Sequence, residues 1–401
     1  MSATSQLQDR FAASLMPNYG LPAVALSHGD GATVVDTDGK SYLDFIGGIA
    51  TSVLGHGHPA LVAAVSGQVA KLAHSSNLFI NEPAVELAEK LLEQLDAPGK
   101  VFFANSGTEA NECALKLAMK HGKALGRNRF VAATDGFHGR SLGALSLTGK
   151  ASIREPFGPF GPEVTFVPFG DADALRDAVD GEVAAVFLEP VQGESGVNPP
   201  ETGYLAAARQ ICDASDALLV VDEIQSGIGR TGRFFAHQHE DITPDIITLA
   251  KGLAGGLPIG ACIGLGAAAD LFDKGDHGST FGGNPVAAAA GLAVITTIHT
   301  DGLMDNAVKL GDDLAAGITA LDHPLVSGVR GSGLWLGVVL TEDLAAELND
   351  ALTQGGVLAN PVRPNVLRLA PPLTITKSDV DRFLAQLALA LEAVYPPGGR
   401  P

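Results

Sequence analysis

The sequence predicts an α/β fold organised around a mostly parallel, doubly wound β-sheet. Two apolar runs, at residues 218–221 and 246–250, contain no alternating polar positions, which is typical of strands buried on both faces of a parallel sheet. Other strand-like runs alternate with helix-like segments, the usual pattern of a sheet covered by helices on both sides. The strand-like runs lie at 100–104, 130–134, 164–168 and 183–189, and the helix-like segments at 109–120, 172–179 and 203–214.

The length of 401 residues allows more than one domain, and 46% hydrophobic residues with 49 glycines fit a compact α/β enzyme. We expect the arm before the first long helix and the C-terminal part to form a smaller α+β domain beside the large one. The predicted divisions are an N-terminal arm at 1–58, a large domain at 59–295 and a C-terminal part at 296–401.

The N-terminal arm carries a strong hairpin signal. Strand-like runs at 33–36 and 41–44 flank Asp38 and Gly39, a dipeptide that favours a tight turn. Helical patterns follow at 59–73 and 83–95.

The C-terminal third begins with a long helix, which Asn284 caps and Pro285 starts. Beyond it we expect strands near 331–340 and 366–369, a last helix at 377–394 and a disordered Pro- and Gly-rich tail at 396–401.

The composition excludes several classes of function. A formal net charge of −19 argues against general binding to nucleic acid or anionic membranes, which need basic surfaces. The three cysteines, Cys113, Cys212 and Cys262, are isolated, so we predict no disulfide framework and no metal site. Without a signal pattern at the start or an apolar stretch long enough to cross a bilayer, a cytoplasmic protein is expected.

The two apolar runs end at residues that carry chemistry. Asp222 follows the first run and Lys251 the second, and ligands bind beyond the carboxyl ends of such strands. An amine and a carboxylate at this edge suit pyridoxal phosphate, whose aldehyde the amine binds as a Schiff base while the carboxylate keeps a proton on the ring nitrogen. A buried Asp222–Lys251 ion pair is the alternative, and these two residues alone do not decide between them.

Two further segments extend this site. Ser106, Gly107 and Thr108 lie between a strand and a helix, where free backbone N–H groups attract anions, although an ordinary helix cap explains the same residues. After another strand, Phe137 and Arg140 offer an aromatic face and a guanidinium group.

Together these segments resemble the class III, fold-type I pyridoxal-phosphate aminotransferases, and within them most closely the group that acts on acetylornithine. The resemblance covers nearly the whole chain, and the motifs occur in family order, which is far more specific than any one of them. They are NSGTEANE at 105–112, FHGR at 137–140, DEIQSG at 222–227, AKG at 250–252 and GSTFGGNP at 278–285.

The resemblance implies how the cofactor is held. Lys251 would bind the pyridoxal 5′-phosphate aldehyde and move the substrate proton, and Asp222 would hold the proton on the ring nitrogen. Gln225 would hydrogen-bond the 3-oxygen, and Phe137 would stack on the ring. Ser106, Gly107 and Thr108 would bind the phosphate, together with Thr280 from the neighbouring subunit of a homodimer.

The resemblance also implies the substrate contacts. Arg140 would bind the distal carboxylate bidentately with help from Ser279, and Arg368 would bind the carboxylate beside the reacting carbon of glutamate. Glu194 would neutralise Arg368 when the other substrate is bound. The alternative is that Glu194 is an exposed acidic residue of a loop and that Arg368 forms a structural ion pair.

The implied reaction transfers the side-chain amino group of N2-acetyl-L-ornithine to 2-oxoglutarate, giving N-acetyl-L-glutamate 5-semialdehyde and L-glutamate, a step of arginine biosynthesis. Within the family the alternatives are ornithine, succinylornithine or succinyl-diaminopimelate, and 4-aminobutyrate aminotransferases. A glutamate-semialdehyde aminomutase, which needs no 2-oxo acid, and a non-catalytic cofactor-binding protein are the alternatives from other classes.

Overall fold

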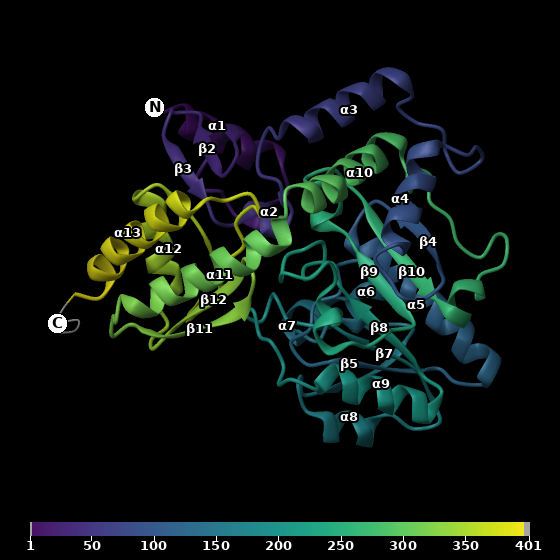
Figure 1. Ribbon diagram of the computed structural model, residues 1–401. Coiled ribbons are helices and arrows are strands. Elements are labelled where there is room, and N and C mark those ends of the chain that lie inside the picture. The colour runs from purple at the N-terminus through teal and green to yellow at the C-terminus, as the bar shows by residue number, and fades with distance from the viewer. Residues whose placement is uncertain (1, 397–401) are drawn as a thin grey trace.

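The computed structural model describes residues 2–396, so most of the predicted C-terminal tail lies outside the described residues. Figure 1 shows a large body built on one twisted sheet and a smaller body that contains both the N-terminal and the C-terminal segments of the chain.

The large body contains a seven-stranded sheet in the order β4-β10-β9-β8-β7-β5-β6. Neighbouring strands from β9 to β6 are parallel, and β10 runs antiparallel to both β9 and β4, so the mostly parallel sheet is confirmed. The strands are β4 Gly99–Ala104, β5 Arg129–Ala133, β6 Glu163–Val167, β7 Val183–Leu188, β8 Leu218–Asp222, β9 Ile246–Leu249 and β10 Gly260–Leu265.

Helices cover both faces of this sheet, as the doubly wound pattern predicts. In β8, Leu218 and Val220 pack in the cluster that contains α5, whereas Leu219 and Val221 pack in the cluster that contains α8 and α9. This alternation follows from the strand period of two, which sends successive side chains to opposite faces. The helices of this body are α3 Pro59–Lys71, α4 Glu82–Leu92, α5 Gly107–Leu125, α6 Leu142–Leu147, α7 Ala151–Arg154, α8 Ala172–Ala178, α9 Tyr204–Ser215 and α10 Pro285–Thr300.

Helix starts follow the local sequence. The Ser106 hydroxyl accepts the N–H of Glu109 at 3.3 Å and caps α5. The Asn284 side chain accepts the N–H of Val286 at 2.9 Å, and Pro285 occupies the first turn of α10, as predicted. The predicted last helix is α13 Lys377–Val394, which begins with a capping box between Thr376 and Asp379.

The smaller body contains two four-stranded sheets, in the orders β1-β2-β3-β13 and β11-β12-β15-β14. The predicted hairpin is β2 Thr33–Asp36 with β3 Ser41–Asp44, and β3 also pairs in parallel with β13 Val357–Leu358. That pairing joins the N-terminal arm to the C-terminal part (Figure 1). The predicted domain boundaries remain a prediction.

The expected strand near 331–340 is present but shorter, as β12 Trp335–Leu340. The chain turns at Gly333, whose φ is +56°, and residues 331–332 end a preceding antiparallel strand, β11 Val326–Ser332, most of which the sequence did not indicate. The other strands are β1 Leu26–Asp30, β14 Asn360–Arg363 and β15 Val366–Leu369, and the other helices are α1 Ala3–Ser14, α2 Gly47–Ala50, α11 Leu303–Ala320 and α12 Ala345–Gln354.

Within residues 2–396 no single helix is long and apolar enough to cross a membrane. Only α10 and α11 taken together reach that length and composition, and they are bent by 67° at their junction.

Candidate active site

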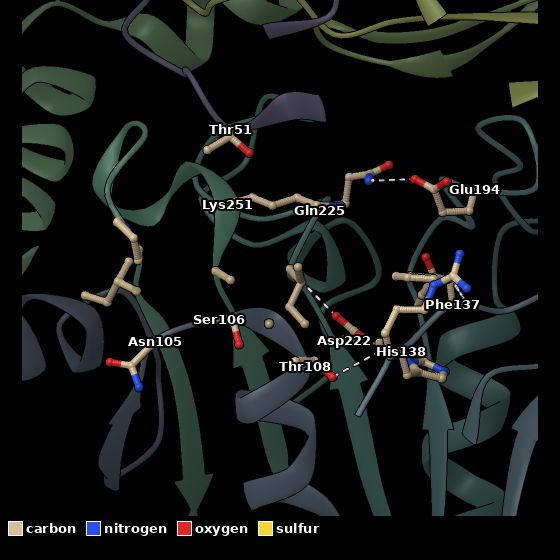
Figure 2. A pocket seen from close by; sticks show the side chains of 18 of the residues that line it. Thr51, Asn105, Ser106, Thr108, Phe137, His138, Glu194, Asp222, Gln225 and Lys251 are labelled. Atoms are coloured by element: carbon tan, nitrogen blue, oxygen red, sulfur yellow. Dashed lines mark hydrogen bonds and ion pairs between the residues drawn. The ribbon is translucent and has the colours of Figure 1, made fainter. Parts of the chain in front are cut away.

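A cavity of about 430 Å³ lies beyond the carboxyl ends of the sheet's parallel strands. It is lined by nine of the residues that the sequence singled out, shown in part in Figure 2. These are Ser106, Gly107, Thr108, Phe137, Arg140, Glu194, Asp222, Gln225 and Lys251. Ser279, Thr280 and Arg368 are not part of its lining.

Lys251 enters the cavity directly after β9, at the first residue of the 3₁₀ turn η4 Lys251–Ala254. Its φ of +41° is unusual for a residue with a side chain, and conformations of this kind concentrate at functional sites. Burial lowers the pKa of Lys251 to about 8, and its Nζ makes no hydrogen bond or ion pair with any residue in the range 2–396. The lowered pKa therefore increases the fraction of this amine that is neutral near neutral pH.

Asp222 is the last residue of β8 and is buried. Its Oδ2 accepts hydrogen bonds from Asn111 Nδ2 and His138 Nδ1, both at 2.8 Å, and Oδ1 accepts the N–H of Ile224 at 3.0 Å. Asp222 thus pairs with His138 and not with Lys251, so the alternative of an Asp222–Lys251 ion pair is wrong.

The contact with Asp222 favours the protonated form of His138. Burial favours the neutral imidazole, but the hydrogen bond and charge of Asp222, together with the charge of Glu189, outweigh burial and raise the pKa of His138. The result is a buried, charge-assisted pair that fixes the direction of the Asp222 side chain.

The start of α5 presents two unused backbone donors to the cavity. The amide N–H groups of Gly107 and Thr108 have no hydrogen-bond acceptor among the residues that the structure describes, as expected in the first turn of a helix. A Cβ at Gly107 would lie 2.8 Å from the Cδ1 atom of Ile224, so a larger residue there would force the Ile224 side chain to move. Ser106 is the cap of α5, so the helix-cap interpretation is confirmed, whereas the anion site stays a prediction.

The Thr108 side chain joins α5 to the loop that carries Phe137 and Arg140. Its Oγ1 accepts the N–H groups of Arg140 at 3.1 Å and Ser141 at 3.0 Å, and it lies 2.7 Å from the Ser141 hydroxyl. The exposed Arg140 guanidinium lies 5.7 Å from the centre of the Phe137 ring.

Glu189, at the end of β7, ties two loops of the cavity together. Its carboxylate accepts the N–H of Phe137 at 2.9 Å and that of Gly193 at 3.4 Å. Burial raises the pKa of Glu189 to about 7; the charge of nearby His138 and the two N–H groups lower it, and the charge of Asp222 raises it further.

Arg368 and Glu194 form an ion pair at 2.7 Å at one end of the cavity. Arg368 lies on β15 with only 2% of its side chain exposed, whereas 36% of the Glu194 side chain is exposed. The same arginine nitrogen donates to Gln225 Oε1 at 3.0 Å and to the Gly193 carbonyl at 3.2 Å. Burial opposes the charge on Glu194, but Arg368 and Lys251 outweigh it and lower the Glu194 pKa.

Ser279 and Thr280 lie apart from this cavity. The Ser279 hydroxyl accepts the N–H of Gly282 at 2.9 Å and a bond from Asn105 at 3.1 Å, and Thr280 is exposed. The described chain alone therefore does not bring these two residues to the other predicted site residues.

Sequence reasoning gave no role to three residues of this site: Asn111, Glu189 and Thr51. Glu189 closes the apolar run of β7 in the same way that Asp222 closes β8, so the strand-end rule contained a signal for it. Asn111 lies one helical turn beyond Thr108 in a segment already singled out. Thr51 lines the cavity from a segment whose residues Ile49 and Ala50 have positive φ, and no local pattern marks it.

An unpaired amine of lowered pKa, a buried carboxylate and two unused helix amides around one cavity define a pyridoxal-phosphate-dependent enzyme on a fold-type I scaffold. The chain belongs to the class III aminotransferase family, whose model matches residues 16–391.

Named relatives agree with this assignment over nearly the full length. The chain is 53% identical over 393 residues to the acetylornithine aminotransferase of Mycobacterium tuberculosis, covering 98% of this chain and 97% of the relative. It is 54% identical over 386 residues to that of Streptomyces coelicolor, covering 96% and 95%.

Solved structures agree as well. The ornithine aminotransferase of Toxoplasma gondii superposes with a TM-score of 0.94 at 33% identity, covering 98% of this chain and 96% of that one. A second structure of that protein has pyridoxal phosphate at partial occupancy in its active site. The acetylornithine aminotransferase of Elizabethkingia anophelis has a TM-score of 0.86 at 31% identity, covering 98% and 100%. This chain is accordingly a pyridoxal-phosphate-dependent aminotransferase.

Proposed function

We propose that this enzyme transfers the side-chain amino group of N2-acetyl-L-ornithine to 2-oxoglutarate, giving N-acetyl-L-glutamate 5-semialdehyde and L-glutamate, as a cytoplasmic step of arginine biosynthesis. The observation that carries the proposal is the Arg368–Glu194 pair at a cavity that Arg140 also lines, where the Arg140 guanidinium makes no ion pair with any residue in the range 2–396. Relatives with this activity in their name, at 47–54% identity, support the choice of amino donor.

Groups from three segments of the chain would hold the cofactor non-covalently. The N–H groups of Gly107 and Thr108, with the Ser106 cap beside them, would bind its phosphate, and Asp222 would keep a proton on its ring nitrogen. Phe137 would cover one face of the ring, and Gln225 would donate to the 3-oxygen. When bound, pyridoxal phosphate supplies an electron sink for the electrons left behind when the substrate loses its proton.

Lys251 would hold the cofactor covalently between turnovers and then move a proton at its Nζ. Its pKa of about 8 places it close to the operating pH, where proton transfer in both directions is most efficient. The unpaired state of the amine leaves it free for both tasks.

The two arginines would divide the recognition of the two substrates. Acetylornithine reacts at its side-chain end and has one distal carboxylate, which Arg140 would bind. Ser279 would assist only if a neighbouring subunit brought it to this cavity, as proposed below for Thr280. Glutamate has a second carboxylate beside its reacting carbon, which Arg368 would bind. An unpaired Arg368 in a buried site is costly, so Glu194 would neutralise it while acetylornithine is bound and turn toward solvent when glutamate enters.

The enzyme would act as a homodimer. Leu78, Phe79 and Ile80 are consecutive apolar residues that are 87%, 71% and 90% exposed, more than a monomer surface usually leaves uncovered. In a dimer the exposed Thr280 would contribute to the partner's phosphate site. Cofactor affinity should then fall together with dimer content on dilution, and a sedimenting monomer with full activity would contradict this.

The test of the proposed donor is a single-turnover experiment. The purified yellow holoenzyme is mixed separately with acetylornithine, succinylornithine, ornithine and 4-aminobutyrate, without a 2-oxo acid. We expect acetylornithine to remove the visible cofactor band fastest at equal concentration. Faster bleaching by succinylornithine, ornithine or 4-aminobutyrate would contradict the proposed donor. Repeated turnover of glutamate 1-semialdehyde without any acceptor would indicate the aminomutase.

A further inference from the structure

A second cavity lies behind the loop that carries Glu194, at the seam between the large sheet and the sheet of β15. Its volume is about 300 Å³, and it does not share a lining residue with the active-site cavity. The charged side chains in its lining are Arg330 on β11, Arg363 on β14 and Asp135 in the turn after β5.

The cavity has more positive than negative charge. Arg363 donates to Asp135 at 3.0 Å, and Asp135 is the only acidic residue in the lining. Arg330 uses its Nε for the Gly196 carbonyl at 2.9 Å, and neither of its terminal nitrogens has a partner among residues 2–396. The lining therefore contains two guanidinium groups and one carboxylate, and that carboxylate is paired with Arg363.

This local excess is unusual for the chain. The protein has 45 acidic residues against 26 basic ones, so two neighbouring arginines with free donors stand out against a negative background. Burial and the charge of Arg363 both lower the pKa of Arg330, so a negative group between the two arginines would relieve their repulsion.

The same arginines hold the active-site loop. Arg330 donates to the carbonyl of Gly196 and Arg363 Nε donates weakly, at 3.4 Å, to that of Ser195, the two residues that follow Glu194. Through Asp135, Arg363 also contacts the turn that precedes Phe137. A ligand in this cavity would therefore contact the two arginines that hold the loop after Glu194 and the turn before Phe137.

We propose that this cavity binds a small oxyanion, a carboxylate or a phosphate group, between Arg330 and Arg363. Planar guanidinium groups bind such anions bidentately, and the free terminal nitrogens of Arg330 provide the donors. The bound anion takes the place of Asp135 as the partner of Arg363. The site is distinct from the proposed substrate site and does not depend on the identity of the amino donor.

The test is calorimetric titration of the holoenzyme with sodium phosphate and, separately, with sodium acetate at low ionic strength. Arg363→Gln should weaken binding by about tenfold or more, which corresponds to the loss of one charge-assisted hydrogen bond. Asp135→Asn should tighten it, because the competing carboxylate is removed. Asp135 has a φ of +62°, a conformation that asparagine adopts readily, so this variant keeps the turn.

Three controls make the outcome decisive. Arg129→Gln removes an arginine of similar exposure, 23% against 27%, which is likewise paired with an aspartate, and should leave binding unchanged. Arg140→Gln should also leave it unchanged. Arg363→Lys keeps the charge and reports whether the fold tolerates substitution.

Equal affinity in wild type, Arg363→Gln and Asp135→Asn would overturn the proposal. Loss of binding in Arg140→Gln would also overturn it, since the anion would then occupy the active site. The absence of binding of both anions to wild type and to Asp135→Asn would overturn it too. The anion that binds more tightly identifies the group for which the site is built.

Discussion

The two sides of the active site are built differently. The cofactor side, defined as Asp222, Lys251 and the start of α5, lies at strand ends and a helix start of one sheet, and the Asp222 carboxylate is held there by three donors. The carboxylate side, defined as Glu194, Arg368 and Arg140, spans two sheets, and one member of its ion pair is 36% exposed. Under the proposed roles, the chemistry common to both half-reactions would use buried, fixed groups, whereas the recognition that differs between them would use a partly exposed group, Glu194.

The largest effect should come from the cofactor side. Lys251→Ala should abolish turnover with every donor, because proton transfer alone is worth ~10²–10⁴ in rate. Cofactor should still bind non-covalently through the α5 amides and Asp222. Borohydride reduction and peptide mapping check the attachment, and a trapped cofactor on another lysine would contradict the assignment.

Asp222→Asn should be the next most damaging change. It removes a buried charge that His138 complements, and breaking such a pair typically costs about 3–5 kcal/mol. Both half-reactions should slow by orders of magnitude and to a similar extent. Rapid-mixing rates for each half-reaction measure this, with His138→Asn as a comparison that removes the cation and leaves the carboxylate. Near-normal rates in Asp222→Asn would show that Asp222 does not face the cofactor.

Glu194→Ala should have a smaller and selective effect. Arg368 is then left without its carboxylate partner, so the acetylornithine half-reaction should slow by about tenfold, the order expected for one charged hydrogen bond. The glutamate half-reaction should be unchanged or faster. Glu194→Gln, which keeps the shape and loses the charge, should behave in the same direction, and equal slowing of both halves would contradict the switch.

The last effect is on stability and not on rate, and it concerns Glu189, which links the two loops. Its pKa is raised from 4.5 to about 7 in the folded chain, so between these pH values the folded protein keeps a proton that the unfolded chain releases. Glu189 therefore destabilises the fold as pH rises through this window, by at most about 3 kcal/mol. Glu189→Gln should gain in urea midpoint relative to wild type from pH 4.5 to 7. A pH-independent difference would show that Glu189 does not titrate there.

Much of the fold and part of the site could be predicted from local sequence. The runs that end at Asp222 and Lys251 indicated β8 and β9, because a short, continuous apolar run between turn residues is typical of a strand buried on both faces. Strand β10 was missed because its GACIGL sequence follows a Gly-rich turn and is rich in small residues that carry little strand signal.

The missed site contacts have a common physical reason. Glu189 binds the N–H of Phe137, 52 residues away, and Asn111 binds Asp222, 111 residues away. Contacts of this kind depend on how helices and strands pack, which no local pattern encodes. The Arg368–Glu194 pair is equally distant, 174 residues apart, and was predicted only through the family resemblance.

The central claim is that the carboxylate side changes between the two half-reactions while the cofactor side serves both. The direct measurement is the ratio of the single-turnover rates with glutamate and with acetylornithine, in wild type and in Arg368→Ala, with Arg368→Lys as the charge-preserving control. The account predicts that Arg368→Ala lowers this ratio by about tenfold or more, whereas Asp222→Asn leaves it nearly unchanged. A ratio in Arg368→Ala equal to that of wild type would contradict it.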